Sequence, residues 1–219
     1  MPSRPLTPST SSRDRLLRAA KRLFAAQGYE QTATSAIARA AGTSESQLMR
    51  YFGGKVGLLN ALFDAAWTDL NRTIGSIAAS ADSPREAIVA LANHIVATLG
   101  RDPEQAMLFL FEARRLRGGA KRVRLSSGFV AFSDLIRSLV KRGLADGVFK
   151  SKLDASAMTA AVLGALESML RERLMMKARG ARVFGEREIR RTLDAMLAGF
   201  EQAPRTARRR SAVPRARAS

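Results

Sequence analysis

Apolar residues recur every three or four positions along most of this chain, which is the spacing of one face of an α-helix. The first such segment covers residues 13–27, where Leu16, Ala20 and Phe24 form a stripe that Gly28 ends. Further helical segments are predicted at residues 34–41, 44–52, 55–77, 84–99, 103–111, 129–140, 154–170 and 186–200. No segment shows the strict alternation of a β-strand, so the pattern predicts an all-α protein.

Residues 34–55, TSAIARAAGTSESQLMRYFGGK, predict two short helices joined by a tight turn. Thr34 offers a hydroxyl that suits the N-cap of the first helix, and Gly42 follows where a helix end needs a left-handed residue. Ser44 begins the second helix, and Gln47 stands three residues later, which is the spacing of a capping box. Two helices joined in this way form a helix-turn-helix, whose second helix enters the major groove of DNA.

The second helix of this pair has one apolar side and one polar side. Leu48 and Phe52 lie four residues apart and therefore share a buried side. The other side leaves six candidates for reading bases: Ser44, Glu45, Ser46, Gln47, Met49 and Arg50. Arginine can pair with guanine and glutamine with adenine, and methionine can cover a thymine methyl group. Such a helix uses three or four side chains on the bases, and Gln47 has the capping box as a rival role.

Composition and charge narrow the class of partner. The chain has 219 residues and a formal net charge of +18, and an excess this large favours a polyanionic partner such as DNA. It contains no cysteine, which excludes disulfides and thiolate metal sites and suits a reducing cytoplasm. The N-terminus lacks the apolar core of a signal peptide, and no stretch is apolar enough to span a membrane. We therefore expect a cytoplasmic protein, associated with the nucleoid, that has no membrane partner.

The two ends of the chain differ in composition from its middle. Residues 1–12 are rich in Pro, Ser and Thr, and residues 203–219 hold six arginines, no acidic residue and no apolar stripe. Both ends are predicted to be disordered arms, the second of them basic. Between them we expect a helix-turn-helix DNA-binding domain over residues 13–60 and a second helical domain over residues 61–202.

Residues 13–62 also resemble the TetR family of bacterial transcriptional regulators. The matching features are LF-x-x-x-GY, a threonine before IA-x-x-AG, a serine after Gly42, and YF-x-x-K-x-x-LL, all in register without a gap. The resemblance implies an all-helical homodimer with an N-terminal three-helix DNA-binding domain and a C-terminal helical ligand-binding and dimerisation domain. It further implies a repressor that releases DNA on binding a small molecule. Ser46 and Met49 stand where glycine and an aromatic residue are common in the family, so no base preference is transferred.

Three more residues are candidates for contacts with the DNA backbone. Thr34 lies at a helix N-terminus, where a hydroxyl and backbone N–H groups can meet a phosphate. Lys55 begins the next helix, where we expect its ammonium and the helix dipole to favour a phosphate. The resemblance places Tyr51 at a family position that touches the DNA backbone, and the plain alternative is a half-buried ring beside Phe52.

The C-terminal helices offer only weak candidates for ligand binding. They are His94, Trp67, Phe109 and Met158. Aromatic and methionine side chains at helical spacing are more often plain core, and a single histidine is more often structural. A metal site of histidine and cysteine is excluded by the counts. No catalytic or phosphate-loop motif is present, so we expect neither an enzyme nor a cofactor, and isolated acids such as Glu112 and Glu167 are predicted to be solvated or ion-paired.

The last two long helices are predicted to form a two-fold dimer interface, because they carry excess apolar surface. The residues concerned are Ala157, Ala161, Val162, Ala165 and Met169 on one helix and Ile189, Leu193, Met196, Leu197 and Phe200 on the other. The leading interpretation is a sequence-specific regulator of transcription, a repressor that leaves a palindromic operator in double-stranded DNA when an unidentified small molecule binds. The alternative is a sequence-tolerant architectural protein that binds nucleic acid through its basic arms. A helical enzyme is a third hypothesis, and the sequence contains no nucleophile–base pair for it.

Overall fold

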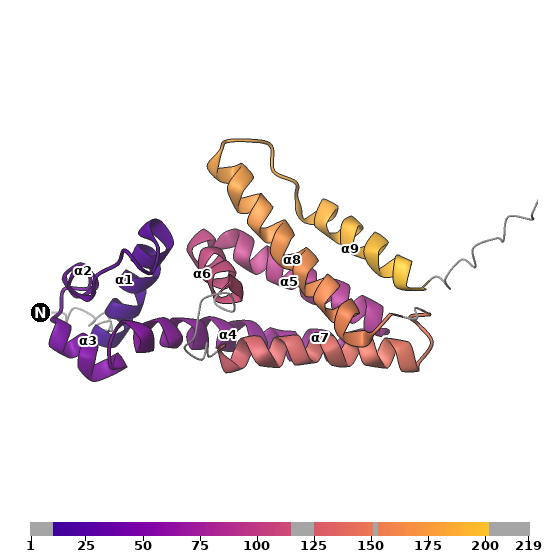
Figure 1. Ribbon diagram of the computed structural model, residues 1–219, viewed down its shortest axis with the longest axis horizontal. Helices are drawn as coiled ribbons and strands as arrows, with labels where there is room; N and C mark the ends of the chain where they lie inside the picture. The colour runs from indigo at the N-terminus through magenta and orange to yellow at the C-terminus, as the bar shows by residue number, and fades with distance from the viewer. Residues whose placement is uncertain (1–10, 115–124, 151–152, 202–219) are drawn as a thin grey trace, which may run out of the picture.

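The computed structural model describes residues 11–114, 125–150 and 153–201, and these residues form nine α-helices and no strand (Figure 1). The helices are α1 (Ser12–Gln27), α2 (Thr34–Ala40), α3 (Glu45–Phe52), α4 (Lys55–Ser80), α5 (Pro84–Arg101), α6 (Pro103–Arg114), α7 (Ser127–Ala145), α8 (Ala155–Ala178) and α9 (Glu186–Glu201). The prediction of an all-α fold is confirmed for these residues. Most of the predicted N-terminal arm and all of the basic tail lie outside them. None of the helices described is long and apolar enough to cross a membrane.

The helices α1, α2 and α3 and the first turns of α4 form a head at one end of the molecule (Figure 1). Its buried residues include Leu16, Phe24, Ile37, Leu48 and Leu58. Ser11 caps α1 by accepting a hydrogen bond from the N–H of Asp14 at 3.0 Å. A Cβ atom at Gly57 would lie 1.7 Å from the carbonyl oxygen of Phe52, so only glycine lets α4 begin this close to the end of α3.

The long helix α4 belongs to both parts of the molecule. It has 26 residues, leaves the head and runs along the body beside α7 (Figure 1). In the body it buries Trp67, Leu70 and Ile74. The domain boundary predicted at residues 60 and 61 falls inside this continuous helix, and the division into two domains stays a proposal.

The body is built around α5, which packs against α4, α6, α7 and α9. Pro84 begins α5 as predicted, after the cap that Ser83 provides, and Ile88, Leu91 and Ile95 are among its buried residues. The helix α8 packs against α7 and α6. The helix α6 lies between head and body, because it packs against α1 on one side and against α4, α5 and α8 on others.

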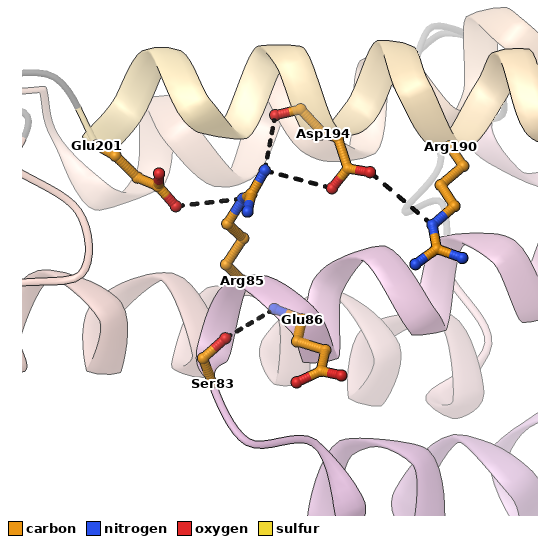
Figure 2. A network of polar contacts seen from close by, with 6 residues as sticks. All are labelled: Ser83, Arg85, Glu86, Arg190, Asp194 and Glu201. Atoms are coloured by element: carbon orange, nitrogen blue, oxygen red, sulfur yellow. Dashed lines mark hydrogen bonds and ion pairs between the residues drawn. The ribbon is translucent and has the colours of Figure 1, made fainter.

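Arg85, near the start of α5, fastens α9 to the body (Figure 2). Its guanidinium donates to the carbonyl oxygen of Asp194 at 3.3 Å and to the carboxylate of Asp194 at 3.4 Å. Its Nε lies 3.2 Å from the carboxylate of Glu201, and Arg190 lies 3.9 Å from the second carboxylate oxygen of Asp194. The side chains around Arg85 are about one-third exposed, so these ion pairs orient α9 and add only modestly to stability.

Two contacts join the head to α6. Lys21 of α1 forms an ion pair with Asp102, which also accepts a hydrogen bond at 3.0 Å from the N–H of Gln105 in the first turn of α6. Near the other end of α6, the rings of Tyr29 and Phe111 lie 5.8 Å apart. Partial burial acts to raise the pKa of Asp102. The hydrogen bonds that it accepts and the charge of Lys21 outweigh burial, so this pKa lies below its ordinary value.

Candidate nucleic-acid interface

Backbone hydrogen bonds fix the turn between α2 and α3. The N–H of Thr43 donates to the carbonyl of Ala38 at 3.0 Å, and the N–H of Gly42 donates to that of Arg39 at 3.1 Å. Gly42 has a φ of 61°, which lies in the left-handed region that this type of helix ending requires. The prediction that Gly42 follows the end of α2 is confirmed, and the turn sets the orientation of α3 against α2.

Thr34 has a different role from the predicted N-cap. The capping position of α2 is Ala33, which makes no side-chain cap, and Thr34 is the first residue of the helix. The Thr34 hydroxyl donates to the carboxylate of Glu45, at the start of α3, at 2.6 Å. The cap prediction was wrong because the helix begins at Thr34 itself, one residue past the capping position from which a side-chain oxygen can accept the first free N–H groups. The expected contact between Thr34 and a phosphate stays a prediction.

Ser44 caps α3, and Gln47 does not complete a capping box. The Ser44 hydroxyl accepts a hydrogen bond from the N–H of Gln47 at 3.3 Å, which confirms the predicted cap. The side-chain oxygen of Gln47 instead accepts a hydrogen bond from the hydroxyl of Thr43. Ser46 is also engaged locally, since its hydroxyl lies 2.8 Å from that of Ser44. Gln47 is half-buried and is therefore the least available of the predicted base-reading residues.

The outer side of α3 is open to solvent. Leu48 is fully buried on the inner side, whereas Glu45, Met49 and Arg50 are exposed, Met49 to 55%. The guanidinium of Arg50 lies 5.1 Å from the centre of the Tyr51 ring, which is itself exposed. The sequence thus placed the two sides of α3 correctly. Contacts of these residues with DNA stay predictions.

Lys55 holds the loop between α1 and α2. Its ammonium donates to the carbonyl oxygens of Tyr29, Glu30 and Thr32 at 3.0, 3.3 and 3.1 Å. It also lies 4.4 Å from the centre of the Tyr29 ring. These three acceptors match the three N–H donors of an ammonium, so a phosphate would have to compete with them. Lys55 therefore has a structural role in holding this loop, which competes with the predicted phosphate contact and which the sequence spacing did not reveal.

The structure brings together two of the four weak ligand candidates. The rings of Trp67 and Phe109 are tilted to each other with their centres 4.6 Å apart, and both line one cavity of the body. Met158 is fully buried near the start of α8. It lines neither this cavity nor the open groove that lies between α6 and α8. His94 lines a separate polar hollow with Asp102. Phe129 and Phe132 also line this cavity, and they were not among the candidates from the sequence. Their spacing of three residues was the available signal, because it places both rings on one side of a helix.

Glu112 corrects another prediction, since it is neither solvated nor ion-paired among the residues described. Its side chain is only 1% exposed. One carboxylate oxygen accepts a hydrogen bond from the indole N–H of Trp67 at 2.8 Å, and the other accepts one from the N–H of Ser126 at 2.8 Å. The carboxyl group of Glu112 is therefore enclosed by protein and held by two uncharged N–H donors.

Comparison with known proteins identifies the head. Residues 16–62 match the family model described as bacterial regulatory proteins, tetR family. This range covers most of α1, all of α2 and α3, and the first turns of α4. No curated protein sequence matches the chain.

Solved structures share the fold over nearly the whole of both chains. The TetR family transcriptional regulator PfmR from Thermus thermophilus is 27% identical, with a TM-score of 0.66 over 89% of this chain and 100% of its own. The transcriptional regulator FadR from Bacillus subtilis, in complex with stearoyl-CoA, is 17% identical, with a TM-score of 0.72 over 84% and 96%. AibR, in complex with isovaleryl coenzyme A and operator DNA, is 19% identical, with a TM-score of 0.67 over 87% and 99%.

The geometry and the comparisons agree. The family model covers the helix-turn-helix whose second helix is exposed on its outer side, and the structural neighbours extend the likeness through the helical body. Residues 16–62 therefore match the TetR family of bacterial regulatory proteins, and the chain as a whole shares the fold of solved DNA-binding regulators of transcription.

Proposed function

We propose that this regulator is a homodimeric repressor that binds a palindromic operator and leaves it when a small molecule binds to the body. The observation that carries the proposal is the way in which α3 is held with its outer side exposed to solvent. Its inner side is anchored by Leu48, its outer side is exposed, and the turn at Gly42 braces it on α2. A helix held in this way fits the major groove, and AibR, which shares the fold, is described with operator DNA.

The exposed residues of α3 are assigned to two kinds of DNA contact. Arg50 and Met49 have the side chains best suited to base edges, since they can address guanine and the thymine methyl group respectively. Glu45 can address cytosine, although one of its carboxylate oxygens already accepts the hydroxyl of Thr34. Thr34 and Tyr51 are assigned to phosphates, which position the protein without reading sequence. Ser44, Ser46 and Gln47 are second choices for the bases, because each already has a partner within α3 or its turn.

The dimer interface is proposed on the outer sides of α8 and α9, with a corrected set of residues. Val162, Ile189, Leu193 and Leu197 are at most 2% exposed within one protomer, so the prediction that they meet a partner was wrong. They face the core of their own protomer. The outward residues include a set of small ones: Ala157, Ala160, Ala161 and Gly164 on α8 and Ala195 and Gly199 on α9. Small side chains let helices approach closely, and a two-fold interface suits a palindromic operator.

The effector is proposed to bind among α4, α6, α7 and α8, where the aromatic cavity lies. Two structural neighbours, FadR and AibR, are described with acyl-CoA compounds. Because these two proteins are only 17% and 19% identical to this chain, the likeness concerns the fold and not the ligand. The chemistry of this effector must therefore come from the cavity residues of this chain. Acting on the chromosome, the protein is proposed to associate with the nucleoid in the cytoplasm.

The test is a selection of bound fragments from genomic DNA, followed by footprinting on the enriched sites. We expect a shared two-fold symmetric motif and a discrete footprint. The variant Arg50→Ala should retain weak binding to any DNA and lose the motif. Uniform coverage without a motif would contradict the proposal and support the sequence-tolerant architectural alternative, for which the net charge of +18 is the main argument.

A further inference from the structure

A cavity in the body has four aromatic rings in its wall. The ring centres of Phe109, Phe129 and Phe132 lie 4.6, 5.8 and 5.5 Å from that of Trp67. The cavity has a volume of ≈ 80 Å³. Leu110 lines both this cavity and an open, mainly apolar groove of ≈ 410 Å³ between α6 and α8. The two spaces together suit a ligand with a compact head and an apolar tail.

A buried acidic side chain lies at the edge of one of these rings. Glu112 accepts the indole N–H of Trp67 and the backbone N–H of Ser126, both at 2.8 Å, and both donors are neutral. None of the ion pairs formed by the described residues involves Glu112. Among these residues its carboxyl group thus has two hydrogen bonds and no cation, and a buried acid is stabilised best when it is paired.

This arrangement makes the cavity wall electronegative. The face of an aromatic ring carries partial negative charge, and a carboxylate that accepts the indole N–H pushes further electron density toward the Trp67 ring. A second carboxylate, that of Glu167, lines the same cavity. Its pairing with Arg171 is loose, at 3.5 Å and with both side chains about one-third exposed. Rings and acids together favour a cation over a neutral or anionic head group.

We infer that the effector is an amphiphilic cation with a compact head, such as a quaternary ammonium group, and an apolar tail. The head lies among Trp67, Phe109, Phe129 and Phe132 and compensates the charge of Glu112. The tail extends into the groove beside Leu110. This inference rests on the proposed function for the claim that the cavity is the effector site. An acyl chain in the same place would bring no positive charge to Glu112.

The first experiment compares three ligands that share an eight-carbon chain: octyltrimethylammonium, 1-octanol and octanoate. Trp67 is the only tryptophan in the chain, so its fluorescence reports binding at the cavity wall without a label. We expect the cation to bind about tenfold more tightly than the alcohol, and the carboxylate to bind more weakly than the alcohol. Equal affinity for cation and alcohol, or tightest binding of octanoate, would overturn the inference.

The second experiment removes the acid while keeping one of its two hydrogen bonds. Glu112→Gln retains an amide oxygen for the Trp67 N–H and loses the acceptor for the Ser126 N–H, so affinity for the cation should fall to that of octanol while octanol binding stays the same. The matched control is Glu172→Gln, an exposed position on α8, which should change neither affinity. If Glu112→Gln does not fold, Phe109→Leu replaces it, because it removes one ring and keeps an apolar side chain. A cation affinity unchanged in the folded variant contradicts the inference.

The third experiment separates this inference from the proposed function. Operator binding is measured first without ligand, then with octyltrimethylammonium and with stearoyl-CoA. We expect the cation to release the operator and stearoyl-CoA to have little effect. Release by stearoyl-CoA alone would leave the repressor proposal intact and reject the cation. Absence of any operator binding would reject the repressor, while the fluorescence results would still decide what the cavity binds.

Discussion

Replacing Lys55 with methionine separates two roles of one ammonium group. Methionine keeps an unbranched apolar side chain that can lie against the Tyr29 ring, but it removes the donors to the carbonyls of Tyr29, Glu30 and Thr32. A hydrogen bond from a charged donor contributes about 1.5–3 kcal/mol. Water can replace the ammonium at these carbonyls, because the site is only partly buried. We therefore expect a total loss of about 1–3 kcal/mol in the free energy of unfolding.

The assay is chemical denaturation at a fixed protein concentration, which matters because dimerisation contributes to the measured stability. The matched control is Lys177→Met, which removes a positive charge from an exposed position at the end of α8. That control should leave the free energy of unfolding within about 0.5 kcal/mol of the wild type. A comparable loss in both variants would show that net charge, and not the loop contact, is responsible.

DNA binding supplies the second measurement on the same variant. A phosphate contact made by Lys55 would reduce the slope of log affinity against log salt by about one unit per protomer when it is removed. Because the ammonium is already held by three carbonyls, we expect the slope to stay the same at temperatures where the variant is folded. Unchanged stability together with a reduced slope would refute this reasoning and restore the phosphate contact expected from the sequence.

Three more predictions concern base reading, the contact between head and body, and the dimer. Arg50→Ala should cost about 1–3 kcal/mol on the operator and much less on random DNA, as measured by titration on both, and an equal loss would indicate a phosphate contact. Asp102→Asn should remove the ion pair with Lys21 and cost at most about 1 kcal/mol at neutral pH. The pKa of Asp102 is lowered in the folded state, so its stabilisation is present above its unfolded pKa and is lost as the pH falls through the folded pKa. The free energies of unfolding of variant and wild type should therefore converge as the pH is lowered in denaturation experiments, and a constant difference would contradict this. Gly164→Arg should give folded monomers with weak DNA binding in sedimentation and titration, whereas an unchanged dimer would place the interface elsewhere.

The parts of the fold that the sequence predicted are those set by local rules. The starts of the helices, the cap at Ser44 and the turn at Gly42 each depend on residues within one or two turns of each other. The ends were predicted less well, since α7 and α8 continue five and eight residues beyond their predicted ends. Helical periodicity also distinguished the inner side of α3 from its outer side. Leu48 and Phe52 lie four residues apart, so they share the side that packs on the neighbouring helices. The helix-turn-helix is almost entirely local in this sense, which is why its geometry could be anticipated.

Contacts between distant segments could not be read in the same way. Thr34 meets Glu45 across a turn, Lys55 finds its acceptors more than twenty residues earlier, and Glu112 meets Trp67 of another helix. Each partner is chosen by how helices pack, and spacing within one helix carries no information about that. The apolar stripe of α9 shows a related limit, since the pattern around Leu193 reveals a buried side without saying whether its neighbour is the same chain or a second copy.

The unbroken course of α4 gives the molecule a lever arm. At 1.5 Å per residue, the distance along the helix from Trp67 to Lys55 is about 18 Å. A tilt of about 5° at Trp67 would therefore displace the start of α4, and the head packed on it, by about 1.6 Å. Direct hydrogen bonds to base edges tolerate distance changes of only about 0.5 Å, so such a tilt is enough to break them. A ligand that shifts Trp67 slightly can thus disengage the head without unfolding any segment, provided that α4 stays stiff.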